Sequence, residues 1–279
     1  MVESILARVM SLATRENNVS TSTQASLDVS IRDQVAVLTL QRPAARNALN
    51  TELMLGLADA AERADSDPAV RCLVITGSEG NFAAGADIDE LAARGAADGP
   101  GDPRVSAWQR LQRLDKPVIA AVEGYCLGGG CELALSADLL VVAEDAKLGQ
   151  PEIRLGIIPG AGGLHRLAIT LGKTRAMHLA LTGDTFSGRE AFEWGLASQC
   201  CEMGQALATA MATANRLTKG APLAQRLAKR AVLSATEEMH RQGFEMARRS
   251  FEVLLSSPDK EEGMRAFREK RKPRFGETS

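Results

Sequence analysis

The stretch PVIAAVEGYCLGGGCEL, residues 117–133, decides the fold. It begins with the apolar run Pro117–Val122, turns through glycines, and continues as an apolar helix near Glu132. A short continuous apolar run bounded by turn residues is typical of a strand that is buried on both faces. A buried strand that passes through a glycine turn into a helix indicates an α/β protein.

Outward from this stretch, strand-like and helix-like segments alternate along the chain. Further short strands are predicted at Val35–Leu40, Cys72–Thr76 and Leu139–Ala143. Asn50 is a good N-cap for a helix with apolar residues at helical spacing, which ends before Asp67. This alternation predicts an α/β fold with largely buried strands.

The character of the sequence changes after about residue 205. Helices are predicted at Ala206–Leu217 and Pro222–Leu233, followed by a long helix that starts near Ser234. Ser234 and Glu237 form a capping-box signature at that start. The pattern leaves open whether these helices pack on their own body or on another subunit.

The composition of the 279-residue chain weighs against several functional classes. A formal net charge of −2 gives no electrostatic reason to expect nucleic acid as the main partner. No apolar run approaches the roughly 20 residues of a membrane span. The five cysteines fit no zinc spacing, so we expect reduced thiols that pack as small apolar groups. Reduced thiols indicate a reducing compartment, and we predict a cytoplasmic protein.

The first 26 residues differ from the rest of the chain. The weakly amphipathic segment Met1–Arg15 has no small-residue cleavage site after an apolar core, so it does not resemble a secretory signal. The segment Asn17–Ser26 is almost wholly polar. We therefore expect residues 1–26 to form a disordered extension, and the folded body to begin near Leu27.

Three glycine-rich stretches mark the segments that carry chemistry, because glycine allows the backbone to approach a ligand and to present bare N–H groups. The Gly160–Gly163 turn lacks the third glycine of the dinucleotide fingerprint. Gly172–Thr174 resembles the end of a P-loop, but Leu167 occupies the place of the first glycine. The three histidines are scattered, which weakens a Ser/His/Asp interpretation. The stretches are Phe82–Ile88, Gly124–Leu133, and Gly149–Glu152 with the following Ile158–Gly163.

Two glutamates beside these stretches are candidate acid–base groups. Glu132 follows three glycines, with no lysine or arginine within ten residues. The helix dipole favours an acid at this place, but burial without a cation would raise its pKa and suit it to proton transfer. Glu152 follows a proline and precedes Arg154, and alone such a residue is more often a surface residue or the partner of an arginine. Two acids beside glycine-rich turns favour catalysis more than either does alone.

The order and spacing of these motifs resemble the crotonase superfamily, and within it the enoyl-CoA hydratases, from about Leu27 to Phe275. The resemblance implies an α/β fold made of a crotonase-like spiral of ββα turns over residues 27–205. A helical trimerisation section would follow at 206–279, giving a homotrimer or, as two trimers, a homohexamer. The matching stretches are Arg42–Asn50, Phe82–Ile88, Pro117–Glu132, Gly149–Glu152, Ile158–Gly163, Leu181–Asp184 and Gly263–Lys272.

The resemblance also implies a reaction and the residues that perform it. Water would add reversibly to one face of a 2-trans-enoyl-CoA, as in fatty acid metabolism, with CoA as part of the substrate and no metal or separate cofactor. Glu132 would be the base on water and Glu152 the proton donor. The thioester oxygen would bind the backbone N–H groups of Ala86 and Gly129. Many isomerase relatives lack one or both acids, so their presence here favours a hydratase.

Further residues are implied for substrate binding. The loop Ala86-Asp87-Ile88-Asp89 resembles the segment that runs along the pantetheine and adenine parts of CoA. Phe267 and Lys270, on the last helix, resemble residues that a neighbouring subunit lends to the nucleotide end. A solvated charge on an ordinary amphipathic helix is an equal alternative for Lys270.

Several alternatives stay open at this point. The same fold is compatible with an enoyl-CoA isomerase or with a hydratase for a branched acyl-CoA. A non-catalytic CoA-binding or RNA-binding relative is another class, which the two glutamates and the net charge weigh against. The pair Leu164-His165 stands where Thr-Gln is frequent, on a helix expected to border the acyl pocket. The preference for acyl chain length is therefore not fixed by the sequence.

Overall fold

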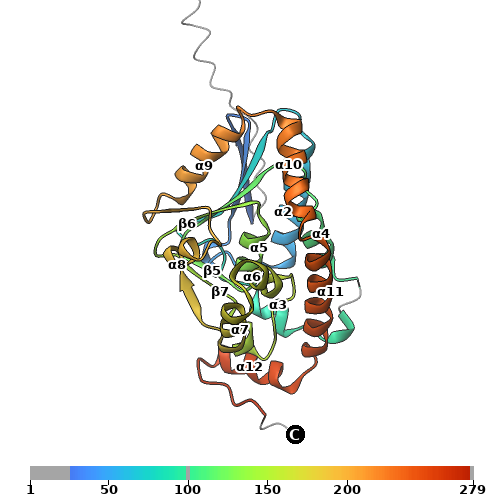
Figure 1. Ribbon diagram of the computed structural model, residues 1–279. Coiled ribbons are helices and arrows are strands. Elements are labelled where there is room, and N and C mark those ends of the chain that lie inside the picture. Colours follow the sequence, from blue (N-terminus) through green and yellow to red (C-terminus); the bar gives the residue numbers. More distant parts are fainter. Residues whose placement is uncertain (1–25, 99–100, 277–279) are drawn as a thin grey trace, which may run out of the picture.

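The computed structural model describes residues 26–98 and 101–276, which contain two β-sheets (Figure 1). The strands are β1 (Leu27–Arg32), β2 (Val35–Leu40), β3 (Cys72–Gly77), β4 (Val118–Val122), β5 (Tyr125–Leu127), β6 (Leu139–Ala143), β7 (Lys147–Gly149), β8 (Thr185–Ser187) and β9 (Gln199–Cys201). The larger sheet has the order β1-β2-β3-β4-β6-β9, antiparallel between β1 and β2 and parallel elsewhere. The smaller sheet has the order β5-β7-β8, with β8 antiparallel to β7.

The helices of the described residues fill the connections and the C-terminal part of the chain. Three short 3-10 turns are η1 (Pro43–Ala45), η2 (Ala96–Asp98) and η3 (Pro151–Leu155). The α-helices are α2 (Thr51–Ser66), α3 (Ile88–Ala92), α4 (Pro103–Leu111), α5 (Gly129–Ser136), α6 (Gly163–Leu171), α7 (Lys173–Thr182), α8 (Gly188–Glu193), α9 (Ala206–Leu217), α10 (Pro222–Ser234), α11 (Glu237–Leu254) and α12 (Pro258–Arg268).

Both faces of the larger sheet are covered, which explains why its strands are continuous apolar runs. Successive residues of a strand point to opposite faces. Along β2, Ala36 and Leu38 pack in the core that contains α2, whereas Val35 and Val37 pack in the core that contains α9. In Figure 1, α9 lies to one side of these strands and α2 to the other. The four predicted strands are present as β2, β3, β4 and β6.

The predicted helix after Asn50 is present as α2. The Asn50 side chain accepts a hydrogen bond from the N–H of Leu53 at 2.9 Å, so it satisfies one of the free donors at the start of the helix. The helix ends at Ser66, before Asp67, as expected. Its buried residues recur at helical spacing and include Leu53, Leu57, Ala60, Ala61 and Ala64.

The C-terminal helices pack on the body of their own chain. α9 covers one face of the larger sheet, α11 lies against α6, and α12 lies against η3 and α3. Figure 1 shows α10 and α11 one after the other along one side of the molecule, with α12 at the end of α11. No residue of α10 is fully buried, which distinguishes it from α9.

The predicted capping box at Ser234 is wrong. Ser234 is the last residue of α10, and its hydroxyl donates to the carbonyl of Ala231 at 2.8 Å. Such a bond satisfies one of the free carbonyls at a helix C-terminus. α11 begins after the turn at Thr236, so Ser234 and Glu237 belong to different helices.

The folded body already includes Ser26. This residue is buried, and its carbonyl accepts a hydrogen bond from the N–H of Gln41 at 2.8 Å. The rest of the predicted extension, residues 1–25, lies outside the described residues. Among the described helices, none is long and apolar enough to cross a membrane.

All five cysteines lie in the described ranges, and all are free thiols. Cys72, Cys126 and Cys131 are buried, while Cys200 and Cys201 are half-buried. Burial raises the pKa of the Cys72 thiol to about 12, so this group stays protonated. The interpretation of the cysteines as packed thiols is confirmed.

Candidate active site

A glycine turn between β5 and α5 sets the position of Glu132. Gly128 has φ +51° and ψ −127°, a backbone conformation that glycine adopts readily and other residues rarely do. Its N–H donates to the carbonyl of Gly149 at 2.9 Å, which ties the turn to β7. α5 begins directly at Gly129, so Glu132 lies in the first turn of the helix.

The carboxylate of Glu132 does not cap its own helix. Its Oε1 accepts hydrogen bonds from the backbone N–H groups of Ala161 at 2.7 Å and Gly163 at 2.8 Å, where α6 starts. A Cβ atom at Gly163 would lie 2.3 Å from Nε2 of Gln150 and 2.9 Å from Cγ of Glu132. The glycine-rich turn before α6 therefore holds the carboxylate of Glu132.

Burial raises the pKa of Glu132 to about 7. The residue is only 4% exposed, so its charged form loses most of its hydration. Hydrogen bonds from Gly163 and Ala161 and the positive charge of Arg166 lower the pKa, but their effect is smaller. Near neutral pH, Glu132 can therefore both take up and release a proton, which is the property of a general base.

The second glutamate, Glu152, lies in η3 and faces the turn at Gly128. Its Oε2 atom is enclosed by protein and forms no hydrogen bond with the described residues. Desolvation, and then the negative charge of Glu132, raise the pKa of Glu152 well above its usual range. Arg154 pairs instead with Asp184, so Glu152 is not its partner. The two acids thus lie in unequal environments within one site.

The N–H groups of Ala86 and Gly129 lie close together. A parallel β-bridge pairs Leu49 with Ala86. In it, the N–H of Leu49 donates to the carbonyl of Gly85, and the N–H of Asp87 donates to the carbonyl of Leu49. In such a bridge, the N–H of Ala86 itself points away from Leu49. A Cβ atom at Gly129 would lie 3.6 Å from the nitrogen of Ala86. Among the described residues, neither amide has a hydrogen-bond acceptor.

Arg42 fixes the segment that carries the Ala86 amide. Its Nη2 donates to the carboxylate of Asp87 at 2.9 Å, and its Nη1 donates to the carbonyl of Ala48 at 2.5 Å. Both partners are neighbours of the Leu49–Ala86 bridge. The Arg42 motif therefore positions a backbone donor that lies 44 residues further along the chain, since 86 − 42 = 44.

A single cavity of about 70 Å³ brings the four candidate catalytic groups together. Glu132, Glu152, Ala86 and Gly129 all line it. A hollow of about 620 Å³ between α2 and α4 contains none of these residues and is open to solvent. The rest of the cavity wall is mainly apolar and includes Leu49, Met54, Leu91, Trp108, Ile157, Ile158 and Phe251.

Leu164 and His165 do not line this cavity, contrary to the expectation that their helix borders the acyl pocket. They lie in α6, and only the loop before it, at Gly160 and Ala161, reaches the wall. His165 packs against α11, where a Cβ atom at Gly243 would lie 2.5 Å from its ring. This side of α6 therefore contacts another helix.

The residues predicted to follow CoA come directly after Ala86 and form the start of α3. Asp87 is the N-cap of this helix, and its Oδ1 accepts from the N–H of Asp89 at 3.1 Å. Ile88 packs against the small core that contains Phe251. Asp89 is exposed and pairs with Arg268 of α12 at 2.9 Å. None of the three lines the cavity, and their contact with CoA stays a prediction.

Phe267 lies on α12 as expected and is 57% exposed. Lys270 does not lie on this helix, because α12 ends at Arg268. Its φ of +53° ends the helix, and the next N–H, of Arg271, bonds back to the carbonyl of Ala266 at 3.0 Å. Neither Phe267 nor Lys270 lines the cavity of its own chain, and their role toward the nucleotide stays a prediction.

Three arginines near the site were not identified from the sequence. Arg104 and Arg248 line the cavity, and Arg166 acts on the charge of Glu132. Arg104 and Arg248 lie far from the glycine-rich motifs in sequence, so only the fold brings them to the site, whereas Arg166 follows Gly163 by three residues. Within the described part of the chain, no group of three or more His, Cys, Asp or Glu side chains is placed to hold a metal ion.

Two enclosed carboxyl groups and two backbone amides around one cavity define a site suited to acid–base chemistry at a carbonyl compound. The sequence matches the family Enoyl-CoA hydratase/isomerase over residues 30–278. It is 45% identical over 245 residues to a probable enoyl-CoA hydratase of Mycobacterium bovis, covering 88% of this chain and 95% of that protein. The chain therefore belongs to the enoyl-CoA hydratase/isomerase family.

Two further comparisons agree with this membership. A 2,3-dehydroadipyl-CoA hydratase of Escherichia coli is 43% identical over 249 residues, which are 89% of this chain and 98% of that protein. The crystal structure of an enoyl-CoA hydratase from Mycobacterium avium subsp. paratuberculosis matches with a TM-score of 0.81 and 31% identity, over 91% of this chain and 99% of that one. The predicted crotonase-like α/β fold is thus confirmed.

Proposed function

We propose that this protein is an enoyl-CoA hydratase, a lyase that adds water reversibly to a 2-trans-enoyl-CoA and gives the 3-hydroxyacyl-CoA. The observation that carries the proposal is the single cavity where Glu132 and Glu152 meet the amides of Ala86 and Gly129. Two of the relatives described above, one named as a probable enoyl-CoA hydratase and one as a 2,3-dehydroadipyl-CoA hydratase, support it. CoA enters as part of the substrate, and no separate cofactor is needed, because the thioester itself activates the double bond.

The unequal environments of the two glutamates support different roles. The anion of Glu132 is stabilised by the N–H groups of Ala161 and Gly163, so it gives up its proton more readily than Glu152. Glu152 has no donor at Oε2 and lies beside the charge of Glu132, so it retains its proton to higher pH. Glu132 is therefore the base that activates water at C3, and Glu152 delivers the proton to C2. Two acids lining one cavity favour addition to one face of the double bond.

The backbone N–H groups of Ala86 and Gly129 stabilise the negative charge that develops on the thioester oxygen during addition. Attack at C3 moves electron density onto the thioester oxygen, which becomes enolate-like. Fixed backbone donors aimed at that oxygen stabilise the transition state more than the ground state. Gly129 is also the first residue of α5, whose N-terminus carries partial positive charge. We therefore assign the oxyanion hole to these two amides.

The size of the cavity favours a short acyl chain. Its volume of about 70 Å³ is well below the roughly 300–1,000 Å³ of a typical pocket for a drug-sized ligand. Apolar side chains such as Met54, Trp108 and Phe251 supply a surface for methylene groups. The nucleotide end of CoA is too large for this space and lies outside the cavity.

The test is hydration of crotonyl-CoA, followed as the loss of absorbance of the conjugated thioester. The purified wild type is expected to turn over, whereas Glu132→Gln and Glu152→Gln each lose roughly a hundred- to ten-thousand-fold in kcat and still bind the substrate. Glu123→Gln, a change of an acid that binds the amides of Gly204 and Ala206, serves as the control. Near-normal turnover in either site variant would refute the roles assigned here.

An isomerase is the alternative within the family, and it differs in the use of water. Moving a double bond needs a proton to leave one carbon and return to another, which one carboxyl group can perform. Two enclosed glutamates favour the hydratase. A protein that shifts 3-enoyl-CoA to 2-enoyl-CoA, but forms no 3-hydroxyacyl-CoA, would reverse this assignment.

We also propose that the protein is a cytoplasmic homotrimer, or a hexamer of two trimers. Apolar side chains that a lone chain exposes on α10 and α11 support assembly, because exposed apolar area of this kind is typical of subunit contacts. Light scattering of the full chain in solution tests the proposed assembly. The side chains are Leu223, Leu227, Val232, Leu233, Met246 and Val253.

A further inference from the structure

Two arginines line the catalytic cavity and have no part in the proposed hydration. Arg104 comes from the first turn of α4 and Arg248 from α11, and both share the cavity wall with Glu132 and Glu152. Their side chains are largely buried, with exposed fractions of 10% and 13%. Buried charges are costly unless they are paired, so a pocket for hydrocarbon alone gives no reason for them.

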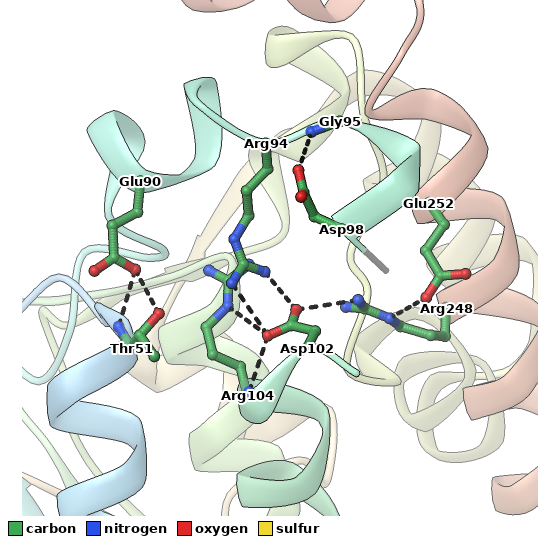
Figure 2. Close-up of polar contacts among 9 residues, drawn as sticks. All are labelled: Thr51, Glu90, Arg94, Gly95, Asp98, Asp102, Arg104, Arg248 and Glu252. Atoms are coloured by element: carbon green, nitrogen blue, oxygen red, sulfur yellow. Dashed lines mark hydrogen bonds and ion pairs between the residues drawn. The ribbon is translucent and has the colours of Figure 1, made fainter. Parts of the chain in front are cut away.

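A buried aspartate holds the two arginines at the cavity. Asp102 is the N-cap of α4, and its side chain is fully buried. Its carboxylate lies 3.1 Å from Nη2 of Arg248 and 3.5 Å from Nε of Arg104. Arg94, which does not line the cavity, also binds this carboxylate. Figure 2 shows the three guanidinium groups gathered around Asp102.

The cluster retains positive charge and free donors. Its three arginines directly contact two carboxylates, Asp102 and Glu252, of which Glu252 accepts from Nε of Arg248 at 2.8 Å. Glu90 acts on Arg104 only at longer range, and its own carboxylate is hydrogen-bonded to the start of α2. The guanidinium of Arg104 contacts the Asp102 carboxylate through Nε. A guanidinium offers five N–H donors in a planar fork, which matches a carboxylate.

We propose that Arg104 and Arg248 bind a carboxylate at the far end of the acyl chain, so that the preferred substrate is a 2-enoyl-CoA of a dicarboxylic acid. The apolar wall beside them, which includes Trp108 and Phe251, contacts the methylene groups between the two ends. Arg248 also lies over the ring of Phe251, at 5.4 Å from its centroid, which keeps its guanidinium at this wall. The inference rests on the proposed hydration and specifies its substrate class.

The kinetic test compares acyl chains of equal length with and without the terminal carboxylate. One pair is 2,3-dehydroadipyl-CoA and 2-hexenoyl-CoA, and a shorter pair is glutaconyl-CoA and 2-pentenoyl-CoA. The wild type is expected to have the higher kcat/KM for the dicarboxylic member of at least one pair, by about ten-fold or more. An equal or lower value for both dicarboxylic members overturns the inference.

Variants then assign the preference to the arginines. Arg104→Gln and Arg248→Gln are each expected to lower the ratio of kcat/KM values, dicarboxylic over uncharged, by about ten- to hundred-fold. Arg94→Gln is the matched control, because it removes a guanidinium from the same Asp102 without changing the cavity wall. If Arg94→Gln lowers the ratio as much as the other two, the arginines act only by holding the fold. Should Arg104→Gln not fold, the same ratio of kcat/KM values is measured with Arg104→Lys, which keeps the charge but not the planar fork of donors.

A binding measurement separates this inference from the proposed reaction. Calorimetry with the saturated thioesters adipyl-CoA and hexanoyl-CoA needs no turnover. Tighter binding of adipyl-CoA, lost in Arg104→Gln, supports the carboxylate site even if no 2-enoyl-CoA is hydrated. Equal binding of the two thioesters, together with normal hydration of 2-hexenoyl-CoA, rejects the carboxylate site and leaves the hydratase assignment intact.

Discussion

Gly128 faces the carboxyl group of Glu152 so closely that a Cβ atom at this position would lie 2.8 Å from Oε1. The methyl group of Gly128→Ala would therefore displace the carboxyl group of Glu152, and alanine would also be strained at a φ of +51°. We expect the free energy of unfolding to fall by about 1–3 kcal/mol and kcat to fall at least ten-fold. Denaturant unfolding and the crotonyl-CoA assay measure the two effects.

Gly204→Ala is the matched control for this variant. Gly204 has φ +78°, but nothing lies within 4 Å of its Cβ position. This change therefore costs stability without affecting Glu152. Equal loss of kcat in both variants would show that strain alone, and not contact with Glu152, reduces activity.

The pKa of Glu132 predicts a specific dependence of stability on pH. Its folded pKa of about 7 is higher than the unfolded value of 4.5, so between these values the folded state binds a proton that the unfolded state has released. The contribution of Glu132 to the free energy of unfolding therefore has its full value below pH 4.5 and is lost as the pH rises to about 7. Glu152, whose pKa is also raised, acts in the same direction and to higher pH.

Glu132→Gln isolates the contribution of this group. The free energy of unfolding of the wild type is expected to fall more steeply between pH 4.5 and 7 than that of the variant, by up to about 1.4 kcal/mol per pH unit. Urea unfolding at several pH values measures both slopes. Parallel slopes would mean that Glu132 has an ordinary pKa in the folded protein.

The sequence predicts four strands of the larger sheet and the helix after Asn50, because their signals are local, whereas β1 and β9 at the two edges of this sheet were not predicted. Each of β2, β3, β4 and β6 is a continuous apolar run, since helices cover both faces of the sheet. The smaller sheet was not predicted. Its strands, such as β5 (Tyr125–Leu127), have only three residues, which is too short for an alternating pattern, and glycines lie at or beside their ends.

For the site, local context indicates Glu132 but not its partners. Three glycines and an apolar helix mark this residue, whereas its donors at Ala161 and Gly163 lie 29 and 31 residues away. Arg248 lies 146 residues from Asp102, and only the fold brings α11 to the N-cap of α4. Such contacts depend on tertiary structure and leave no periodic trace in the sequence. Resemblance to a family supplied the pairing of Glu132 with Glu152, which spacing alone could not.

We predict that the side chain of Asn47 stabilises the loop between β2 and α2, which lies next to the segment of Ala86. Its Nδ2 donates to the carbonyls of Ser78 at 3.0 Å and Asn81 at 2.7 Å, and its Oδ1 accepts from the N–H of Arg42 at 2.9 Å. The side chain is fully buried, so Asn47→Ala leaves these groups without partners. We expect a loss of about 2–4 kcal/mol in the free energy of unfolding, measured by urea denaturation.

Asn215→Ala provides the contrast, because Oδ1 of Asn215 is buried but forms no hydrogen bond with the described residues. Asn215 lies in α9, where alanine is the better helix former. This variant is expected to keep or slightly raise the stability. A small effect of Asn47→Ala, comparable to that of Asn215→Ala, would contradict the support assigned to Asn47.

Gly129→Ala separates folding from catalysis at the proposed oxyanion hole. The new Cβ atom would lie 3.6 Å from the nitrogen of Ala86 and 3.7 Å from Cδ1 of Leu49, which are ordinary contacts. The position begins α5, where alanine is favoured over glycine, so Tm is expected to stay equal or rise. The methyl group nevertheless occupies space beside the Ala86 N–H that the thioester oxygen needs. The backbone N–H remains, but blocking the hole is expected to lower kcat about as much as removal of one donor does, about a hundred- to thousand-fold. A folded Gly129→Ala protein with normal turnover would therefore mean that the oxygen binds elsewhere.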